Sequence, residues 1–197
     1  MKAHSKESQN LMTPESSLTS LVEGNTRFQQ NLRADRNLLE QVKTTSTGQF
    51  PFATILSCID SRVSSELIFD QGIGDIFSAR VAGNIINEDI LGSIEYGCKV
   101  AGSKLVIVMG HTKCGAVTAA CKRVELGNIT PLLSKILPAV DEVIGANGEV
   151  TDSNIEKVSV VNINNAISRM RGESAILNEM EKEGSIQIVG AVYDVAS

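Results

Sequence analysis

The sequence predicts a single α/β domain in which helices flank a mostly parallel β-sheet of four to five strands. Three short apolar runs, at residues 52–58, 75–81 and 104–111, have the length and composition of buried strands. The segments between them repeat their apolar residues every three or four positions, as amphipathic helices do. Strands that alternate with helices indicate parallel βαβ units. A chain of 197 residues, 42% of them hydrophobic, can bury such a core as one domain, residues 1–197.

The first 45 residues are expected to lie outside the sheet. Residues 1–15 are polar and are predicted to form a flexible tail. Residues 16–45 are predicted to form an N-terminal helical arm, because apolar side chains recur along one helical face behind Ser and Thr start signals. The apolar positions of that face are Leu18, Leu21, Val22, Phe28 and Leu32.

The remaining elements follow in alternation. Helical patterns at 64–72 and 86–102 separate the three predicted strands, and another helix is expected over 113–127. The segment 131–145 is helical with a kink expected at Pro138. A long helical pattern then runs from Ile155 to Glu183, and residues 186–195 close the chain as a last strand.

Composition narrows the class of function. The net charge is −5, and Lys and Arg are scattered along the chain, so we expect no nucleic-acid partner. The N-terminus has no apolar signal region and no stretch approaches the length that spans a bilayer, so we expect a cytoplasmic protein without membrane contact. Four cysteines embedded in regular segments favour metal binding or redox chemistry over a disulfide framework.

Three potential metal ligands fall near predicted strand ends. Cys58 and His111 come at the carboxyl ends of two strands, where open parallel sheets bind ligands. Cys114 lies one helical turn beyond His111, at a helix start that favours the thiolate. Two thiolates and one imidazole suit zinc, and three protein ligands leave the open position typical of a catalytic site.

A charged pair accompanies the first cysteine. Alternation along an extended segment is expected to send the side chains of Cys58, Asp60 and Arg62 to one side. The carboxylate would then reach the metal and the guanidinium would reach the carboxylate. Pairing with Arg62 would leave the fourth metal position to water and make Asp60 an acceptor for a proton of that water.

Each feature alone has a simpler interpretation. Cys58 could be a buried apolar cysteine, and an Asp-x-Arg pair is usually a plain salt bridge or turn. A non-catalytic zinc module, in which Asp60 closes the site permanently, and a thiol-redox module are the rival classes of function. Three ligands with a movable fourth argue against the first, and the absence of Cys-x-x-Cys argues against the second. Cys98 and Cys121 are assigned to packing within helices.

The motifs resemble those of the β-class carbonic anhydrases. Cys-x-Asp-x-Arg at 58–62 is followed about fifty residues later by His-x-x-Cys at 111–114, and the similarity extends over nearly the whole chain from Leu18 onward. It includes GN-x-RF at 24–28, SRV at 61–63, GDIF at 74–77, AGN at 82–84, IEY at 94–96, GHTKCGA at 110–116 and GAVYDV near the end.

The resemblance implies an activity and a site. The activity is the zinc-dependent, reversible hydration of carbon dioxide to bicarbonate and a proton by attack of zinc-bound hydroxide. Cys58, His111 and Cys114 would be the ligands, with Asp60 and Arg62 as the catalytic dyad and Asp60 as a conditional fourth ligand. Three side chains of one branch of the family match here and, together with Gly115, are assigned to substrate binding. These three are Gln49, Phe77 and Tyr96.

The resemblance also implies partners and leaves an alternative. Family members are homodimers or larger, so we expect a homodimer or homotetramer in which the N-terminal arm packs on a partner subunit. Hydrolysis of carbonyl sulfide or carbon disulfide on the same zinc site is the alternative within enzymes. Another branch binds bicarbonate at an inhibitory site through a tryptophan and an arginine. Ile55 stands at the tryptophan position and Arg80 at the arginine position, so we expect that pocket to be absent or weak.

Overall fold

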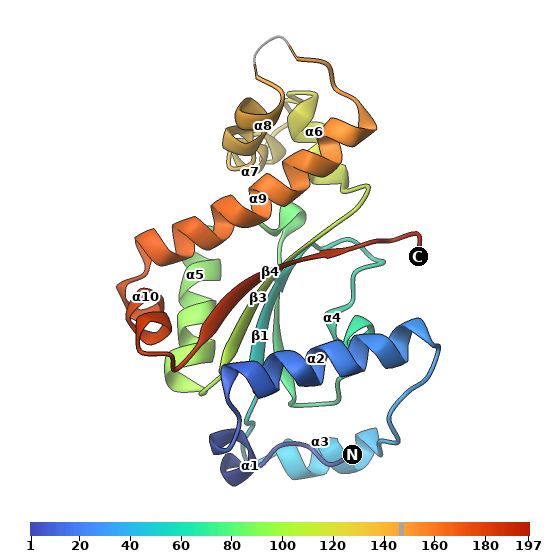
Figure 1. The fold of residues 1–197 in the computed structure, drawn as a ribbon, viewed down its shortest axis with the longest axis vertical. Coiled ribbons are helices and arrows are strands. Elements are labelled where there is room, and N and C mark those ends of the chain that lie inside the picture. The colour runs from blue at the N-terminus through green and yellow to red at the C-terminus, as the bar shows by residue number, and fades with distance from the viewer. Residues whose placement is uncertain (146–147) are drawn as a thin grey trace.

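A computed structural model of the chain describes residues 1–145 and 148–197, and its centre is one four-stranded, all-parallel sheet (Figure 1). The spatial order of the strands is β2-β1-β3-β4. They are β1 (Ala53–Ser57), β2 (Ile76–Arg80), β3 (Leu105–His111) and β4 (Gln187–Tyr193). The predicted α/β class and the parallel sheet are therefore confirmed, and all four predicted strands are present.

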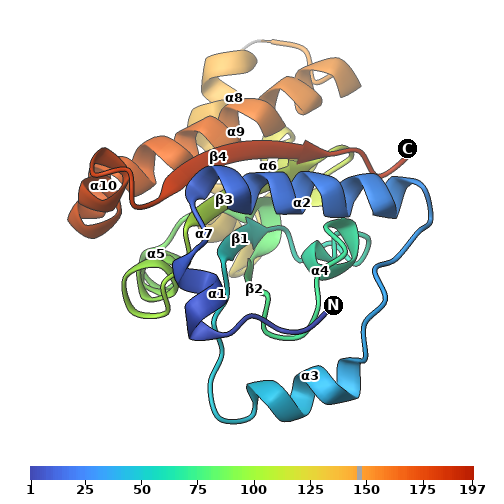
Figure 2. The same ribbon diagram turned by 60° about the horizontal axis from the view of Figure 1, so that its bottom comes forward.

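The sheet is buried on both faces because successive side chains of a strand point to opposite sides. Ile55 and Ile107 pack in the cluster beneath α2 (Pro14–Gln29) and α4 (Ser65–Ile68). Their neighbours Leu56 and Val108 pack in the opposite cluster with residues of α9 (Asp152–Glu173). In Figure 2, β4 lies between α2 and α9, which makes the layers visible. Because both faces of the sheet are covered, every residue of β1 and β3 is buried, and their sequences are largely continuous apolar runs.

Helices α5 and α9 lie on the second face, and α6 to α8 gather beyond the carboxyl ends of the strands (Figure 1). These three helices enclose a separate hydrophobic core cluster, which contains both Cys58 and Cys114. The helices concerned are α5 (Glu88–Glu95), which continues as a π-helical turn over Tyr96–Val100, α6 (Gly115–Cys121), α7 (Ile129–Leu133), α8 (Leu137–Val143), α9 (Asp152–Glu173) and α10 (Ala175–Lys182).

Several predicted helical patterns are shorter or divided in the structure, and the pattern over 64–72 gives only α4. The pattern over 113–127 gives only α6, which ends at Cys121. Arg123 has a φ of 50°, and an α-helix cannot continue through a residue with positive φ. The kink expected at Pro138 is a full break, with Pro138 in the first turn of α8. The long pattern from Ile155 to Glu183 is split at Ser174, whose side chain accepts from the Leu177 N–H and so starts α10.

The N-terminal segment differs from the expected flexible tail. Residues Lys6–Asn10 form helix α1, and Gln9 in that helix is almost fully buried. The Gln9 Nε2 donates to the carbonyl oxygens of Pro51, at 2.8 Å, and Ala101, at 2.7 Å. Since a buried carbonyl needs a donor, these bonds tie the segment to the amino-terminal end of the sheet. His4 of the same segment packs on Phe52, with 5.2 Å between ring centroids. Gln9 and His4 are polar, so the apolar pattern did not reveal this docking.

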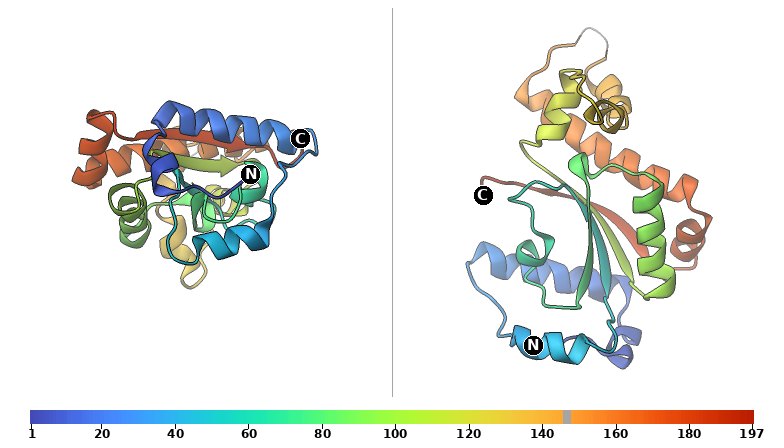
Figure 3. Two further views of the ribbon diagram at one scale, coloured as in Figure 1. Left: turned by 90° about the horizontal axis from the view of Figure 1, so that it is seen from below. Right: turned by 180° about the vertical axis from the view of Figure 1, so that it is seen from behind.

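A further helix, α3 (Leu38–Thr45), forms in the polar part of the predicted arm. The Asn37 side chain caps it by accepting from the Glu40 N–H at 3.0 Å. In Figure 3, α3 stands apart from the sheet, joined to the domain by a connection at each end. Three of its side chains are exposed apolar groups, namely Leu38, Leu39 and Val42.

Candidate metal centre

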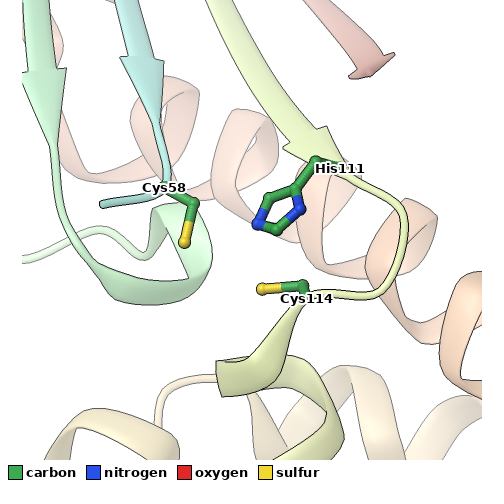
Figure 4. A group of neighbouring side chains, drawn as sticks. All are labelled: Cys58, His111 and Cys114. Atoms are coloured by element: carbon green, nitrogen blue, oxygen red, sulfur yellow. The ribbon is translucent and has the colours of Figure 1, made fainter. Parts of the chain in front are cut away.

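The strand register brings the predicted ligands together. Ser57 at the end of β1 is paired with Met109 of β3, so Cys58 follows β1 at the level where β3 continues to His111. A short turn after β3 then carries the chain back to Cys114, directly before α6. In Figure 4 the two sulfur atoms and the imidazole face one another from these three positions. Their ligand atoms all lie within 4.8 Å of one another, and all three residues are buried.

His111 is held in the tautomer that a metal requires. Its Nδ1 lies 2.9 Å from the carbonyl oxygen of Thr112, and because a carbonyl can only accept, Nδ1 carries the proton. The Nε2 atom is buried and has no hydrogen-bond partner among the described residues. A buried acceptor without a donor is costly, so this orphaned nitrogen is an observation that points to a metal.

The donor set fits zinc. Zinc prefers thiolate and imidazole ligands, and its bonds of about 2.0–2.3 Å are compatible with donors this close together. A hydrogen bond from the Cys114 thiol stabilises the neighbouring thiolate and lowers the pKa of the Cys58 thiol. The backbone N–H of Gly83 also donates to the Cys58 Sγ, at 3.4 Å. The thiolate form, which binds metals, is thus favoured at Cys58 before any ion is present.

The turn after β1 adds the charged pair to this cluster. Arg62 donates to Asp60 through Nε, at 2.9 Å, and through Nη2, at 2.8 Å. Asp60 Oδ2 also lies 3.9 Å from the Nε2 of His111. The hydrogen bonds from Arg62 hold the pKa of the Asp60 carboxyl well below its usual range. An ionised carboxylate therefore lies beside the cluster while paired with a guanidinium.

The geometric reason for this pairing differs from the one expected. Residues 58–62 do not form one extended segment, because the chain turns at residues 60–63, where the Val63 N–H bonds back to the Asp60 carbonyl at 2.9 Å. The Arg62 N–H donates to Asp60 Oδ1 at 3.0 Å, the local bond that Asp makes two residues ahead in turns. The turn, rather than strand alternation, brings the two side chains together.

Gln49, Phe77 and Tyr96 come together at another place. They line one cavity of about 660 Å³ beside β2 and α5, which also includes Thr54. The Phe77 and Tyr96 rings are 6.4 Å apart between centroids, and Tyr96 is 55% exposed. None of the three cluster residues lines this cavity. Within one chain, these three side chains therefore lie apart from the cluster of Cys58, His111 and Cys114.

The remaining residues singled out from the sequence are Gly115 and the two at the second bicarbonate site of another branch, Ile55 and Arg80. Gly115 begins α6 next to Cys114, and a Cβ added to it would meet nothing within 4 Å. Ile55 is completely buried in the core. Arg80 donates through Nε and Nη2 to two backbone carbonyls of the turn after β1. The weakness of that second site stays a prediction.

Several supporting contacts were not expected from the sequence. Asn162 of α9 donates to the Gly83 carbonyl at 2.9 Å, and Glu156 of the same helix accepts from the Lys113 N–H at 2.9 Å. Lys113 has a φ of 54°, so its turn needs such support. Both partners lie more than forty residues along the chain from the turns they hold, and no local pattern marks them.

Comparison with known proteins agrees with this geometry. The family profile described as carbonic anhydrase matches residues 53–197. The chain belongs to the carbonic anhydrase family. It is 32% identical to carbonic anhydrase 2 of Mycobacterium tuberculosis over 188 residues, which covers 92% of this chain and 89% of that protein. It is 30% identical to the carbonic anhydrase of Mycolicibacterium smegmatis over 190 residues, covering 93% and 90% of the two chains.

Solved structures place this carbonic anhydrase in the β class. The β-carbonic anhydrase CafA of Aspergillus fumigatus superimposes with a TM-score of 0.73 at 26% identity, covering 93% of this chain and 86% of that one. The β-carbonic anhydrase CcaA gives 0.71 at 26% identity and covers 90% of each chain. A structure described as a tetrameric β-carbonic anhydrase, from Sordaria macrospora, shares the fold with a TM-score of 0.71 at 19% identity.

Proposed function

We propose that this protein binds one zinc ion through Cys58, His111 and Cys114 and catalyses the reversible hydration of carbon dioxide to bicarbonate and a proton. The observation that carries the proposal is the convergence of these three donors beside an ionised carboxylate that is already paired with Arg62. When bound in such a site, zinc acidifies a coordinated water so that hydroxide is available near neutral pH.

The residues around the cluster then have defined tasks. Asp60 is an acceptor beside the open side of the cluster, so it can orient a water molecule by taking a hydrogen bond from it. Arg62 keeps Asp60 ionised and turned, which stops the carboxylate from becoming a permanent ligand. His111 presents Nε2 because Thr112 fixes its Nδ1 proton. Carbon dioxide is apolar, so aromatic side chains suit its approach.

A second copy of the chain is the proposed source of those aromatic side chains. Gln49, Phe77 and Tyr96 line a cavity that excludes the cluster of their own chain, and Tyr96 is more than half exposed. Exposed apolar side chains also gather around the arm, as expected for a surface that a partner covers. They are Leu32, Leu38, Leu39, Val42 and Leu67. We propose a homodimer, or a homotetramer built from it, with each cluster facing the cavity of its neighbour.

Two further expectations concern the alternative reaction and contact with a membrane. Hydrolysis of carbonyl sulfide or carbon disulfide gains no support, because the family match and the relatives described above are all carbonic anhydrases. Among the helices of residues 1–145 and 148–197, none combines the length and the hydrophobicity that a bilayer crossing requires.

A stopped-flow assay of carbon dioxide hydration, with zinc quantified in the same sample, tests the proposal. Replacing Cys58, His111 or Cys114 with Ala should remove both zinc and activity. Cys121→Ala is the matched control, because Cys121 is also a buried cysteine of the same core cluster but is not among the three donors. Full zinc occupancy and full activity in a donor variant would disprove the assignment.

A further inference from the structure

The side chain of Arg80, at the end of β2, lies across the turn that carries both a proposed ligand and the carboxylate. Its Nε donates to the carbonyl oxygen of Cys58 at 3.0 Å. Its Nη2 donates to the carbonyl oxygen of Asp60 at 2.7 Å. One guanidinium thus bonds the backbone of the cysteine donor and the backbone of the residue proposed to orient water.

This turn needs support from outside itself. The sheet ladder between β1 and β2 ends where the Val81 N–H donates to the Ser57 carbonyl at 3.0 Å. Cys58, Ile59 and Asp60 lie beyond β1, so strand pairing does not fix them. The rigid, planar fork of an arginine can hold two acceptors at once in a fixed geometry, which a lysine ammonium on a flexible stem cannot do.

The same end of β2 holds Cys58 at a second atom. Immediately after Arg80, the chain turns through Ala82–Asn84, and the Gly83 N–H donates to the Cys58 Sγ at 3.4 Å. The Gly83 carbonyl is in turn held by Asn162 at 2.9 Å. Cys58 is therefore fixed at its carbonyl by Arg80 and at its sulfur by Gly83, so the end of β2 determines where the thiolate points.

We propose that Arg80 is a positioning residue, which fixes the Cys58 thiol and the Asp60 carboxylate relative to each other by bonding both backbone carbonyls. This role differs from binding a bicarbonate ion, the role that the resemblance gives an arginine at this position in another branch. Its catalytic consequence rests on the proposed function. Its consequence for metal binding rests only on the proposed metal site, and not on the proposed reaction, because the Arg80 contact is to the backbone carbonyl of Cys58, one of the three proposed donors.

Arg80→Met tests this role, since methionine keeps part of the aliphatic stem and removes every donor. Arg80 is exposed at the surface, so the variant should fold. Arg123→Met is the matched control, because Arg123 is an exposed arginine that pairs with Asp141 away from the metal cluster. Both variants and the wild type would be prepared with zinc and, separately, with cobalt(II), whose visible spectrum reports the coordination of the ion.

We expect three changes in Arg80→Met. Zinc release to a chelator should be about 10-fold faster, as is typical when a supporting contact of a ligand is lost. The visible spectrum of the cobalt form should change, because the thiolate and the carboxylate are no longer held in one arrangement. The kcat for carbon dioxide hydration should fall about 10- to 100-fold with little change in KM, as expected from misplacement of reacting groups. Arg123→Met should match the wild type in all three measurements.

Arg80→Lys separates positioning from general stability. Its single ammonium can bond only one of the two carbonyls at a time, so it should fall between wild type and Arg80→Met. It also replaces Arg80→Met as the test if that variant does not fold. The proposal would be overturned if the variant tested released zinc at the wild-type rate, gave the wild-type cobalt spectrum and kept the wild-type kcat. A wild-type protein that binds zinc but does not hydrate carbon dioxide would instead refute the proposed function, while release and spectra would still decide the role of Arg80.

Discussion

At the scale of single residues, the proposed mechanism depends on the position of Asp60 beside the proposed metal site. Its Oδ2 accepts from Arg62 Nη2 at 2.8 Å and lies 3.9 Å from His111 Nε2, so one oxygen faces both the guanidinium and the cluster. The side chain is only 16% exposed, whereas that of Arg62 is 49% exposed. The carboxylate is therefore a sheltered acceptor whose charge a surface arginine balances.

Asp60→Asn should keep the fold and most of the zinc but lower kcat about 100-fold, a typical loss when a positioned acceptor is removed. The neutral amide cannot act as the same acceptor, and its bonds with Arg62 are weaker because the charge is lost. Turnover would be measured by stopped flow, with zinc content determined on the same sample.

Asp141→Asn is the control for this change, because Asp141 also pairs with an arginine but is 58% exposed and lies outside the cluster. It should be as active as the wild type. If Asp60→Asn were equally fast, the proposed role of the dyad would be wrong.

At the scale of elements, Asp70 ties the connection between α2 and α3 to the end of α4. It accepts from Arg27 and Arg36 at 2.5 Å each and from the Ala34 N–H at 3.0 Å. Both Asp70 and Arg36 are only 7% exposed. Burial raises the pKa of the Asp70 carboxyl, but these hydrogen bonds outweigh it and hold the pKa below its usual value. The Asp70 side chain thus fixes the start of the connection between α2 and α3 to the rest of the domain.

Asp70→Asn should lower the free energy of unfolding by about 3 kcal/mol at pH 7, because Arg36 would be left buried without its counter-charge. Since the pKa of Asp70 is lower in the folded state, the charged carboxylate stabilises the protein fully above the unfolded pKa of about 3.9. That contribution is lost as pH falls through the folded pKa. The difference between variant and wild type should therefore shrink below about pH 4.

Urea unfolding at pH 7 and at about pH 3, at one protein concentration, measures both effects. Glu173→Gln is the control, because the Glu173–Arg169 pair is exposed and should contribute at most about 0.5 kcal/mol. A difference for Asp70→Asn that stays constant over this pH range would contradict the assigned direction of the pKa shift.

At the scale of the whole molecule, one chain holds the two halves of the proposed site in different places. The cluster lies at the carboxyl ends of β1 and β3, whereas the cavity with Gln49, Phe77 and Tyr96 lies beside β2 and α5. Phe77 lies three positions before Arg80, the β2 residue paired with Ser57, which is a distance of about 10 Å along β2. A two-fold dimer can join the cluster of one subunit to the cavity of the other.

Mixing two inactive variants tests this arrangement. Cys114→Ala removes the cluster, and Gln49→Ala impairs the cavity, so each homodimer should have low activity. In a mixed dimer, one of the two sites combines an intact cluster with an intact cavity. After subunit exchange at equal amounts, activity should therefore rise to about a quarter of the wild-type value.

Mixing Cys114→Ala with Asp60→Asn is the control, because both changes affect the same half of the site. In that mixed dimer no site has an intact cluster with an intact dyad, so little activity should return. Failure of the first pair to regain activity after proven exchange would refute a site shared between subunits.

Much of the fold was predictable because the signals are local. The apolar runs before Cys58, around Phe77 and before His111 predicted β1, β2 and β3, and their alternation with helices predicted the parallel sheet. The helix ends were less predictable. Ser174 lies within a continuous apolar pattern, and only its side-chain cap divides α9 from α10. Gln9 is polar, so nothing in the local pattern indicated that its segment is docked.

The sequence by itself indicated which residues could carry the proposed chemistry, since cysteine, histidine and aspartate at those spacings suit what zinc and water require. Only the tertiary structure decided how they are held. The Asp60–Arg62 pair is formed by a turn, and Arg80 and Asn162 support that turn and the Cys58 sulfur from distant elements. Gln49, Phe77 and Tyr96 line a cavity that does not include Cys58, His111 or Cys114 of their own chain. The physical reason is that ligand chemistry belongs to the residue type, whereas contacts across the sheet depend on register and packing between segments far apart in the chain.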